Sequence, residues 1–427
     1  MSSSDQLVLG VDIGTSGVRV VAMDADGEVV AQTAAAMRPP DRAGGSITQP
    51  AAIWLHAVET AFDDLRKLIS FVRIQALAVD GTSGTVLPIN DIGVQLGPAR
   101  MYNDPCSAKS MATIAALAPE TSAAHGSTSA LGRAIELQVL GPDRILHQAD
   151  WIAGMFSGRF DVTDENNALK TGYDPIARCW PAWIAATGMD VSLLPEVVPA
   201  GQIIGGCEGA MADVVGLSDS IAVVAGTTDG CAAFLATGAD QPGDGVTSLG
   251  STLVLKLLSD RPLFASDYGI YSHRIGDMWL AGGASNTGGA ALLQQFTLQQ
   301  MHVLEPRLAP DRETGLDYYP LPGAGERFPI NDPTLVSRVA PRPADDAVFL
   351  QGLLEGIASV EALGYRRLAE IGAPKLSSLR TVGGGAANRA WTDIRRRKLG
   401  VPFLPARSEA AAAGVARLAL KAMLGAI

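Results

Sequence analysis

The sequence predicts an α/β protein made of two similar lobes with a cleft between them. Short apolar runs alternate with stretches of helical spacing along most of the chain. A strand, a polar turn and a second strand occur near residue 12 and again near residue 250, with little sequence identity between the two copies. The chain has 47 glycines in 427 residues and only 5% aromatic residues, which suits tight turns and Ala-rich helices.

The first half of the chain is expected to begin with a β-meander and to continue with alternating helices and strands. The meander has a polar first turn, DIGTSG, and a hairpin turn at DADG. The expected strands are Leu7–Val11, Val18–Met23, Glu28–Ala34, Ile74–Val79 and Ile221–Val224, and a helix is expected at Ile53–Leu68.

A second meander opens the second half. A Pro/Gly-rich stretch, Tyr318–Arg342, carries aromatic and apolar anchors, which indicates an ordered loop rather than a flexible linker. The expected strands are Gly245–Ser248, Leu253–Leu258, Ser272–Arg274, Trp279–Ala281 and Leu379–Val382; the expected helices are Phe349–Glu370, Asn388–Leu399 and an Ala-rich helix over Ala410–Ile427.

The formal net charge of -11 disfavours nucleic acid and membrane surfaces as partners. The N-terminus lacks the basic region of a signal peptide, and the apolar stretch Ala410–Ile427 contains Arg417 and Lys421. The four cysteines show no metal-binding spacing, so we expect buried or half-buried thiols in a reducing compartment. A cytoplasmic protein is therefore expected, either a monomer or a homodimer.

The first candidate motif is DIGTSG, which starts at Asp12. Gly14 and Gly17 let backbone N–H groups crowd an anion, and the hydroxyls of Thr15 and Ser16 add donors. A carboxylate at a strand end can hold a hydrated Mg²⁺. The alternative is an ordinary hairpin turn.

The second motif, GTTDG at Gly226–Gly230, places Asp229 at the start of an expected helix. The N–H groups of a helix start favour an ionised carboxylate, which is what a general base for a hydroxyl group must be. The alternative is a carboxylate that only caps the helix.

Two further Gly-rich turns lie in the second half. SLGST brings Gly250, Ser251 and Thr252 to the turn of the second meander, where they can contact phosphates or simply face solvent. GGGAAN, between a strand and a helix, allows a flat base or ribose to approach closely, and its Asn can bind adenine or cap the helix. The residues of this last motif are Gly383, Gly384, Gly385 and Asn388.

Several other protein classes lack their motifs in this chain. There is no Walker P-loop, no protein-kinase HRD or DFG set and no GxSxG. A nicotinamide-dependent dehydrogenase would need GxGxxG after its first strand, and neither DIGTSG nor GGGAAN supplies it. We interpret the basic run Arg395–Lys398 as a solvated helix face rather than a nucleotide clamp.

The order of DIGTSG, GTTDG, SLGST, FLQGLLEGIASVEALG and GGGAANRAW resembles that of the FGGY carbohydrate kinase family. The resemblance implies two actin-like (ribonuclease H-like) lobes, with ATP and Mg²⁺ bound between them beside a small-molecule sugar. It also implies a sugar-binding lobe over residues 1–236, completed by the helix 410–427, and a nucleotide-binding lobe over residues 237–409.

Within the family the chain resembles the short D-ribulose kinase branch, through VDGTSGTVLP, MYND, DVTDENNALKTGYDP and GLDYYPLPGAGERFPINDP. Xylulokinases usually have a QMHG-like stretch where this chain has TSGT. Ser83 therefore replaces a bulky sugar-contacting pair. The family's Lys–aromatic stretch is not evident between Gly126 and Leu140, which contain Arg133 and no Trp.

The resemblance assigns roles to the motif residues. Asp229 corresponds to the catalytic base, and Asp12 to the carboxylate near the metal and the sugar. The other expected sugar-side residues are Ser16, Gly17, Arg19 and Ser83; the expected ATP contacts are Gly14, Thr15, Gly250, Ser251, Thr252, Gly383, Gly384, Gly385 and Asn388. The predicted reaction is ATP-dependent phosphorylation of D-ribulose to D-ribulose 5-phosphate. The alternatives are a D-xylulose kinase and a non-catalytic sugar or nucleotide sensor.

Overall fold

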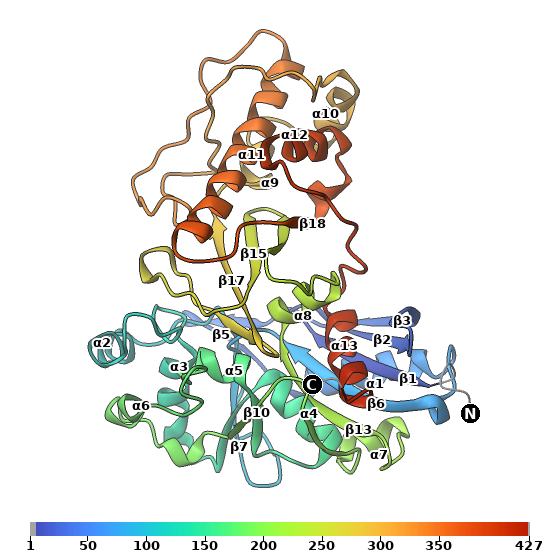
Figure 1. The fold of residues 1–427 in the computed structure, drawn as a ribbon. Coiled ribbons are helices and arrows are strands. Elements are labelled where there is room, and N and C mark those ends of the chain that lie inside the picture. The colour runs from blue at the N-terminus through green and yellow to red at the C-terminus, as the bar shows by residue number, and fades with distance from the viewer. Residues whose placement is uncertain (1–5, 426–427) are drawn as a thin grey trace. The chain divides into compact units, whose positions relative to one another are not determined.

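The computed structural model describes residues 6–425 (Figure 1). The last two residues of the expected helix Ala410–Ile427 lie outside that range. The chain forms two compact units. The first comprises the chain up to Ala236, the short segment His273–Gly276 and the chain from Ala410 onward. The second comprises Thr237–Ser272 and Asp277–Glu409. The prediction had placed His273–Gly276 in the second domain.

The first unit is built on a six-stranded sheet with the order β12-β13-β6-β1-β2-β3. Strands β13, β6 and β1 are parallel neighbours, whereas β1, β2 and β3 form the predicted antiparallel meander. The hairpin turn closes where the N–H of Asp24 donates to the carbonyl of Glu28 at 3.0 Å. The bounds are β1 Leu7–Ile13, β2 Gly17–Asp24, β3 Val29–Ala36, β6 Ile74–Gly81, β12 Ile203–Gly206 and β13 Ala222–Thr228.

Helix α13 (Ala411–Met423) packs on β1 and β6 and beside α8 (Asp229–Ala236), although it comes from the far end of the chain (Figure 1). The packing is close because the facing residues are small. A Cβ atom added to Gly414 would lie 1.7 Å from the carbonyl oxygen of Ala232, so only glycine fits there. The predicted C-terminal helix that completes the first unit is therefore an integral part of its core.

Helix α1 (Ala52–Leu65) packs on β2 and β3, and its Trp54 and Phe62 are fully buried in the core of the unit. A second sheet has the order β4-β5-β8-β7-β9. The remaining bounds in the unit are β4 Asp41–Ala43, β5 Ser46–Gln49, β7 Val86–Ile89, β8 Ala99–Arg100, β9 Arg144–His147, β10 Val162–Asp164, β11 Glu196–Val198, α2 Ala108–Leu117, α3 Ala130–Leu137, α4 Gln148–Ser157, α5 Glu165–Lys170, α6 Ala182–Ala186 and α7 Ala210–Val215.

The segment that the prediction had misplaced contains β16 (His273–Ile275), which contacts α5. The side-chain amide of Asn166 binds β16 as a neighbouring strand would. Its Nδ2 donates to the carbonyl of Arg274, and its Oδ1 accepts from the N–H of Arg274, each at 2.9 Å. This side chain, buried in α5, explains why the short strand belongs to the first unit.

The second unit is built on strands that run β17-β15-β14-β18, with β14 and β18 parallel. Every strand and helix that the sequence predicted in this half is present. The bounds are β14 Asp244–Leu249, β15 Leu253–Ser259, β17 Met278–Ser285, β18 Ser378–Val382, α9 Gly289–Leu293, α10 Leu298–Leu304, α11 Asp346–Glu370 and α12 Arg389–Leu399.

Helix α11 begins after Asp345, whose side chain accepts the N–H of Ala347 at 2.8 Å. By length and composition alone the helix could cross a membrane, but 83% of its most apolar window is buried inside the protein. It is the core helix of the second unit, which accounts for its apolar composition. The predicted ordered loop is also confirmed, since Tyr318, Tyr319 and Phe328 are buried against this core.

Two predictions about individual side chains were wrong. Arg395, interpreted as part of a solvated face, is fully buried and donates to both carboxylate oxygens of Glu361 at 2.6 and 2.7 Å. The pattern of four successive basic residues hid the one that points inward. Cys179 is exposed, whereas Cys106, Cys207 and Cys231 are buried as expected.

Candidate active site

Three neighbouring parallel strands of the first unit end in aspartates. Asp12 lies near the end of β1, Asp80 near the end of β6, and Asp229 directly after β13 as the first residue of α8. Asp12 pairs in register with Asp80, so both side chains lie on the same face of the sheet. In open α/β sheets ligands bind beyond the carboxyl ends of parallel strands. This edge therefore concentrates carboxyl groups where a ligand is expected.

Asp80 is the residue of this cluster that the sequence analysis did not assign. Its carboxyl group is fully buried, and neither oxygen has a hydrogen-bond donor among the described residues. Burial, then the charge of Asp12, raise the pKa of Asp80 well above its usual range. Asp80 is thus a carboxyl group that retains its proton easily.

Asp12 is the more exposed carboxylate of the pair, and Arg19 on β2 lies opposite it in the strand register. The Nη1 of Arg19 donates to Asp12 Oδ2 at 3.4 Å. Burial raises the pKa of Asp12, and the neighbouring charge of Asp229 adds to this effect, whereas Arg19 opposes it. The three predicted residues therefore interact electrostatically in one place.

Asp229 lies at the N-terminus of α8 and is partly exposed. Its Oδ1 accepts the N–H of Gly230 at 2.6 Å. The residue therefore combines the position of a helix-start carboxylate with the surroundings of two further carboxyl groups.

The loop that follows β6 carries Ser83, whose hydroxyl is buried and has no hydrogen-bond partner among residues 6–425. The loop is held from both sides. Thr82 Oγ1 donates to Gln148 Oε1 at 2.7 Å, and Arg133 Nη2 donates to the carbonyl of Gly84 at 2.6 Å. A loop held in this way, with an unpartnered hydroxyl shortly after the strand of Asp80, is suited to bind a polar ligand.

The predicted DIGTSG turn is a tight connection between β1 and β2. The N–H of Gly14 donates to the carbonyl of Gly17 at 3.0 Å, and the carbonyl of Ser16 accepts the N–H of Met37 at 2.8 Å. Ser16 is exposed and Thr15 is partly exposed. The turn lies next to Asp12 in the chain, so its hydroxyl groups belong to the same edge of the sheet.

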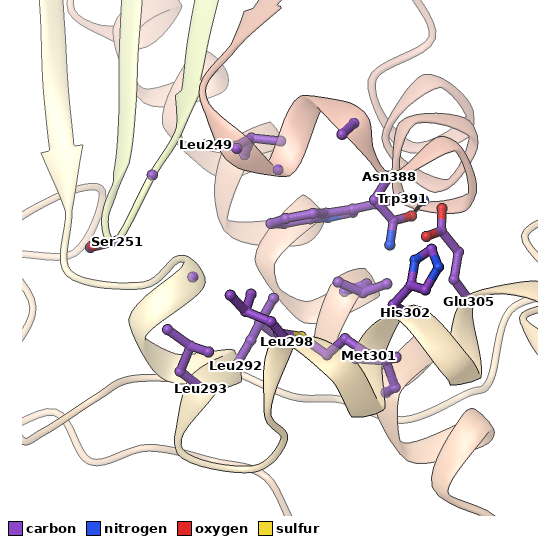
Figure 2. Close-up of a pocket in the computed structure, with 17 residues that line it drawn as sticks. Leu249, Ser251, Leu292, Leu293, Leu298, Met301, His302, Glu305, Asn388 and Trp391 are labelled. Carbon is purple, nitrogen blue, oxygen red and sulfur yellow. Dashed lines mark hydrogen bonds between the residues drawn. The ribbon is translucent and has the colours of Figure 1, made fainter.

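The second unit contains a cavity of about 600 Å³ between the β14–β15 turn, helices α9 to α11 and the start of α12 (Figure 2). The indole of Trp391 and the side chains of Leu249, Leu292, Leu298 and Met301 form its apolar walls. Such walls suit a flat aromatic ligand. They come from segments far apart in the chain, which is why the sequence analysis did not identify them.

Polar groups lie at two ends of this cavity. Figure 2 shows His302, Glu305 and Asn388 grouped at one end, and Ser251 in the turn at the opposite end of the view. The Asn388 Oδ1 accepts the N–H of Trp391 at 2.7 Å and so caps α12, which leaves its amide nitrogen for a ligand. The structure is therefore compatible with both predictions for Asn388, a helix cap and a contact with adenine.

Most of the predicted nucleotide residues of the second unit line this cavity, namely Gly250, Ser251, Gly384, Gly385 and Asn388. Two of them do not. Thr252 lies one residue beyond the lining part of the turn, where its carbonyl accepts the N–H of Gly250 at 3.2 Å. Gly383 lies just before the lining glycines, and its N–H donates to Glu409 at 3.1 Å. Gly14 and Thr15 belong to the first unit.

The donor set is compatible with a nucleotide-bound Mg²⁺. Among residues 6–425, no three His, Cys, Asp or Glu side chains form a metal cluster. A Mg²⁺ that arrives with a nucleotide keeps several waters and needs only one or two carboxylates. Asp12, the more exposed carboxylate at this edge of the sheet, would supply one.

The chain matches two family models. Residues 7–130 match the N-terminal domain of the FGGY family of carbohydrate kinases, and residues 245–423 match its C-terminal domain. A xylulose kinase of Escherichia coli is 24% identical over 91% of this chain and 84% of its own length. An L-fuculokinase of Salmonella typhi is 26% identical over 93% of this chain and 88% of its own length.

Solved structures share the fold. A Brucella ovis protein described as a xyloylose kinase superimposes with a TM-score of 0.87 at 23% identity, covering 99% of this chain and 91% of its own. Plasmodium falciparum glycerol kinase, solved with ADP, gives a TM-score of 0.82 at 15% identity, covering 98% of this chain and 90% of its own. The fold is thus that of the two-lobed, actin-like sugar kinases. The chain belongs to the FGGY family of carbohydrate kinases and is an ATP-dependent sugar kinase.

Proposed function

We propose that this kinase phosphorylates the terminal hydroxyl of a ketopentose, with D-ribulose as its substrate and D-ribulose 5-phosphate as its product. The observation that carries the proposal is the rigid loop beside Asp80, which presents the buried, unpartnered hydroxyl of Ser83. A small serine leaves room where the xylulokinase branch carries bulkier side chains. The hydroxyl group also supplies one hydrogen bond for a sugar hydroxyl.

The proposed catalytic base is Asp229. Its carboxylate accepts the proton of the sugar hydroxyl as that oxygen attacks the γ-phosphorus of ATP. An oxygen–phosphorus bond forms to the sugar, the bond to the β,γ-bridging oxygen breaks, and ADP leaves. The proton passes from Asp229 to solvent. Phosphoryl transfer of this kind depends mainly on positioning and charge neutralisation.

The substrate side of the site rests on the first unit. Asp12 and Asp80 form hydrogen bonds with sugar hydroxyls. The carboxyl group that holds the proton donates, and the ionised one accepts. Arg19 limits the negative charge by its contact with Asp12. Ser16 and Gly17 complete the sugar side through the turn next to Asp12. This division of roles explains why the site combines carboxyl groups of unequal proton affinity.

The nucleotide side rests mainly on the second unit. The adenine lies against Trp391 in the apolar cavity, and the phosphates reach the turn of Gly250 and Ser251. Gly14 and Thr15 of the first unit stay predicted phosphate contacts. Asp12 would hold the Mg²⁺, which would neutralise part of the phosphate charge.

D-Xylulose is the second candidate, because several relatives are named as xylulose kinases. A coupled ADP-release assay with ATP and Mg²⁺ separates the two. The panel contains D-ribulose, D-xylulose, L-ribulose, glycerol and no sugar. We expect a rate well above the blank with D-ribulose and a lower kcat/KM with D-xylulose. The reverse order would contradict the ribulose assignment and support the second candidate.

A Ser83→Ala variant tests the structural basis of the proposal. Loss of one hydrogen bond to a sugar hydroxyl should raise the KM for D-ribulose by about 5- to 10-fold. The KM for ATP should not change. An unchanged KM for every sugar would contradict a contact between Ser83 and the substrate. We also propose a cytoplasmic location, where ATP and free pentuloses are both available.

A further inference from the structure

The second unit has another cavity that the kinase reaction does not use. It has a volume of about 560 Å³ and lies between the C-terminal half of α11, the loop that follows it and the end of α12. It shares no lining residue with the nucleotide cavity. Its volume is within the usual range for small-molecule sites, about 300–1,000 Å³.

The rim of this cavity is positively charged, although the whole chain carries a net charge of -11. Arg366, Lys375 and Lys398 line it. Among residues 6–425, Arg366 and Lys375 have no hydrogen-bond or ion-pair partner for their side chains, and Lys398 is 3.4 Å from Glu313. Glu370 is the one acidic residue of the lining. Its carboxylate pairs with Arg367 at 2.5 Å, which offsets its charge.

The floor of the cavity is apolar. Ala362, Leu376, Leu399 and Val401 supply its apolar lining and are buried or half-buried, whereas the cationic residues are exposed. A ligand that fits both parts carries an anionic group and a carbon body. Arginine binds the oxygens of a phosphate through two parallel N–H groups, and lysines add charge. We propose that this cavity is a binding site for a small organic phosphate that regulates the enzyme.

A hydrogen-bonded connection leads from this cavity to the nucleotide cavity. Tyr365 lines the cationic cavity, and its hydroxyl bonds to Thr247 Oγ1 at 2.9 Å. Thr247 also donates to Glu361 at 2.6 Å, and Glu361 holds Arg395 of α12. Thr247 lies on β14, which ends at Leu249 in the wall of the nucleotide cavity. A ligand that shifts Tyr365 therefore changes the affinity for ATP.

Calorimetric titration of the whole protein with a pentose 5-phosphate tests the binding site. The buffer contains about 0.15 M salt, which screens exposed charges beyond about 8 Å. Inorganic phosphate and a neutral pentose are titrated separately. Because the active site also binds the pentose phosphate under the proposed function, the decisive comparison is between variants. The double variant Arg366→Gln/Lys375→Gln should lose one of two sites, whereas Asp229→Asn should keep the site in the cationic cavity.

The matched control is Arg396→Gln, an exposed arginine of α12 that pairs with Asp393 and does not line the cavity. It should bind as the wild type does. Identical titrations of the wild type and the double variant would overturn the site. Equal affinity for inorganic phosphate and the pentose phosphate would overturn the role of the apolar floor. Since Arg366 and Lys375 are exposed, the melting temperature of the double variant should not change.

The proposed effect of the ligand on ATP binding is tested separately. The affinity for ATP is measured with and without a saturating pentose 5-phosphate, in the wild type and in the double variant. We expect a change of at least about 5-fold in the wild type, the lower limit of typical coupling between sites, and none in the double variant. An unchanged affinity in the wild type would overturn the coupling through Tyr365.

Discussion

Arg133 Nη2 donates to the main-chain carbonyl of Gly84 at 2.6 Å, and so ties α3 to the loop that carries Ser83. The same guanidinium donates to the carbonyls of Asp104 and Thr128 at 2.6 and 2.9 Å. Arg133 is fully buried, and burial lowers its pKa to about 10. A buried cation whose hydrogen bonds go to backbone carbonyls fixes the backbone of the loop.

The Arg133→Met variant should lose both stability and sugar affinity. Methionine fills much of the volume but leaves the buried hydrogen bonds to the carbonyls of Asp104 and Gly84 unmade, which costs about 2–4 kcal/mol of unfolding free energy. Urea denaturation measures this loss, and the KM for the sugar should rise. Arg42→Met on the exposed strand β4 is the control. A variant that is destabilised with an unchanged sugar KM would contradict the link between Arg133 and the site.

Asp229→Asn should lower kcat by about 10²- to 10⁴-fold, because amides do not accept the proton of the sugar hydroxyl. The affinity for ATP should stay near the wild-type value, since the nucleotide cavity lies in the other unit. Steady-state assays and ATP titration measure the two quantities. Asp213→Asn, an exposed position on α7, is the matched control. Near-normal turnover by Asp229→Asn would remove this residue from the role of base.

Asp80→Asn should change how stability depends on pH. The pKa of Asp80 lies well above its unfolded value of 3.8, so the folded state binds the proton more tightly than the unfolded state. Its contribution to stability is present at low pH and is lost as the pH rises through the folded pKa. The asparagine variant does not titrate at this position and so does not lose this stability as the pH rises. Its melting temperature relative to the wild type should therefore increase from pH 5 to pH 8; a difference independent of pH would contradict the assignment.

Leu298→Asp should weaken ATP binding. Leu298 is 73% exposed yet lines the nucleotide cavity, so a carboxylate there repels the nucleotide without disturbing the core. We expect the KM for ATP to rise by about 3- to 10-fold, equivalent to about 0.7–1.4 kcal/mol. Val303→Asp is the control, because Val303 lies on the same helix, is exposed and does not line the cavity. Equal effects of both substitutions would indicate a general charge effect.

The regular elements could be predicted because local patterns determine them. The meander around DIGTSG has strand periods separated by strong turn residues, and Asn388 combines a cap with the start of a helical pattern. Most element ends differ from the predictions by a few residues. His273–Gly276 was misassigned because its membership of the first unit depends on Asn166, more than 100 residues earlier in the chain.

The site was predictable only where a motif marks it. Asp12, Asp229 and the glycine turns stand out in sequence, and the structure places Asp12 and Asp229 together. Asp80 lies inside an apolar strand and looks like an isolated polar residue until the register sets it beside Asp12. A signal was present, since it is an aspartate at the end of a buried strand directly before a Gly-Thr-Ser turn. The cleft between the lobes stays a prediction.

Because α13 fills a gap between β1 and α8, the first unit cannot complete its core until the chain beyond Ala410 has been made. The second unit is encoded entirely before that point. On the ribosome, at about 5–20 residues per second, the second unit can therefore finish folding while the first still exposes the hydrophobic surface of its strands. Nascent chains that stall before α13 should be the preferred clients of chaperones and proteases. A purification tag placed directly after α13 should affect yield more than one placed before β1.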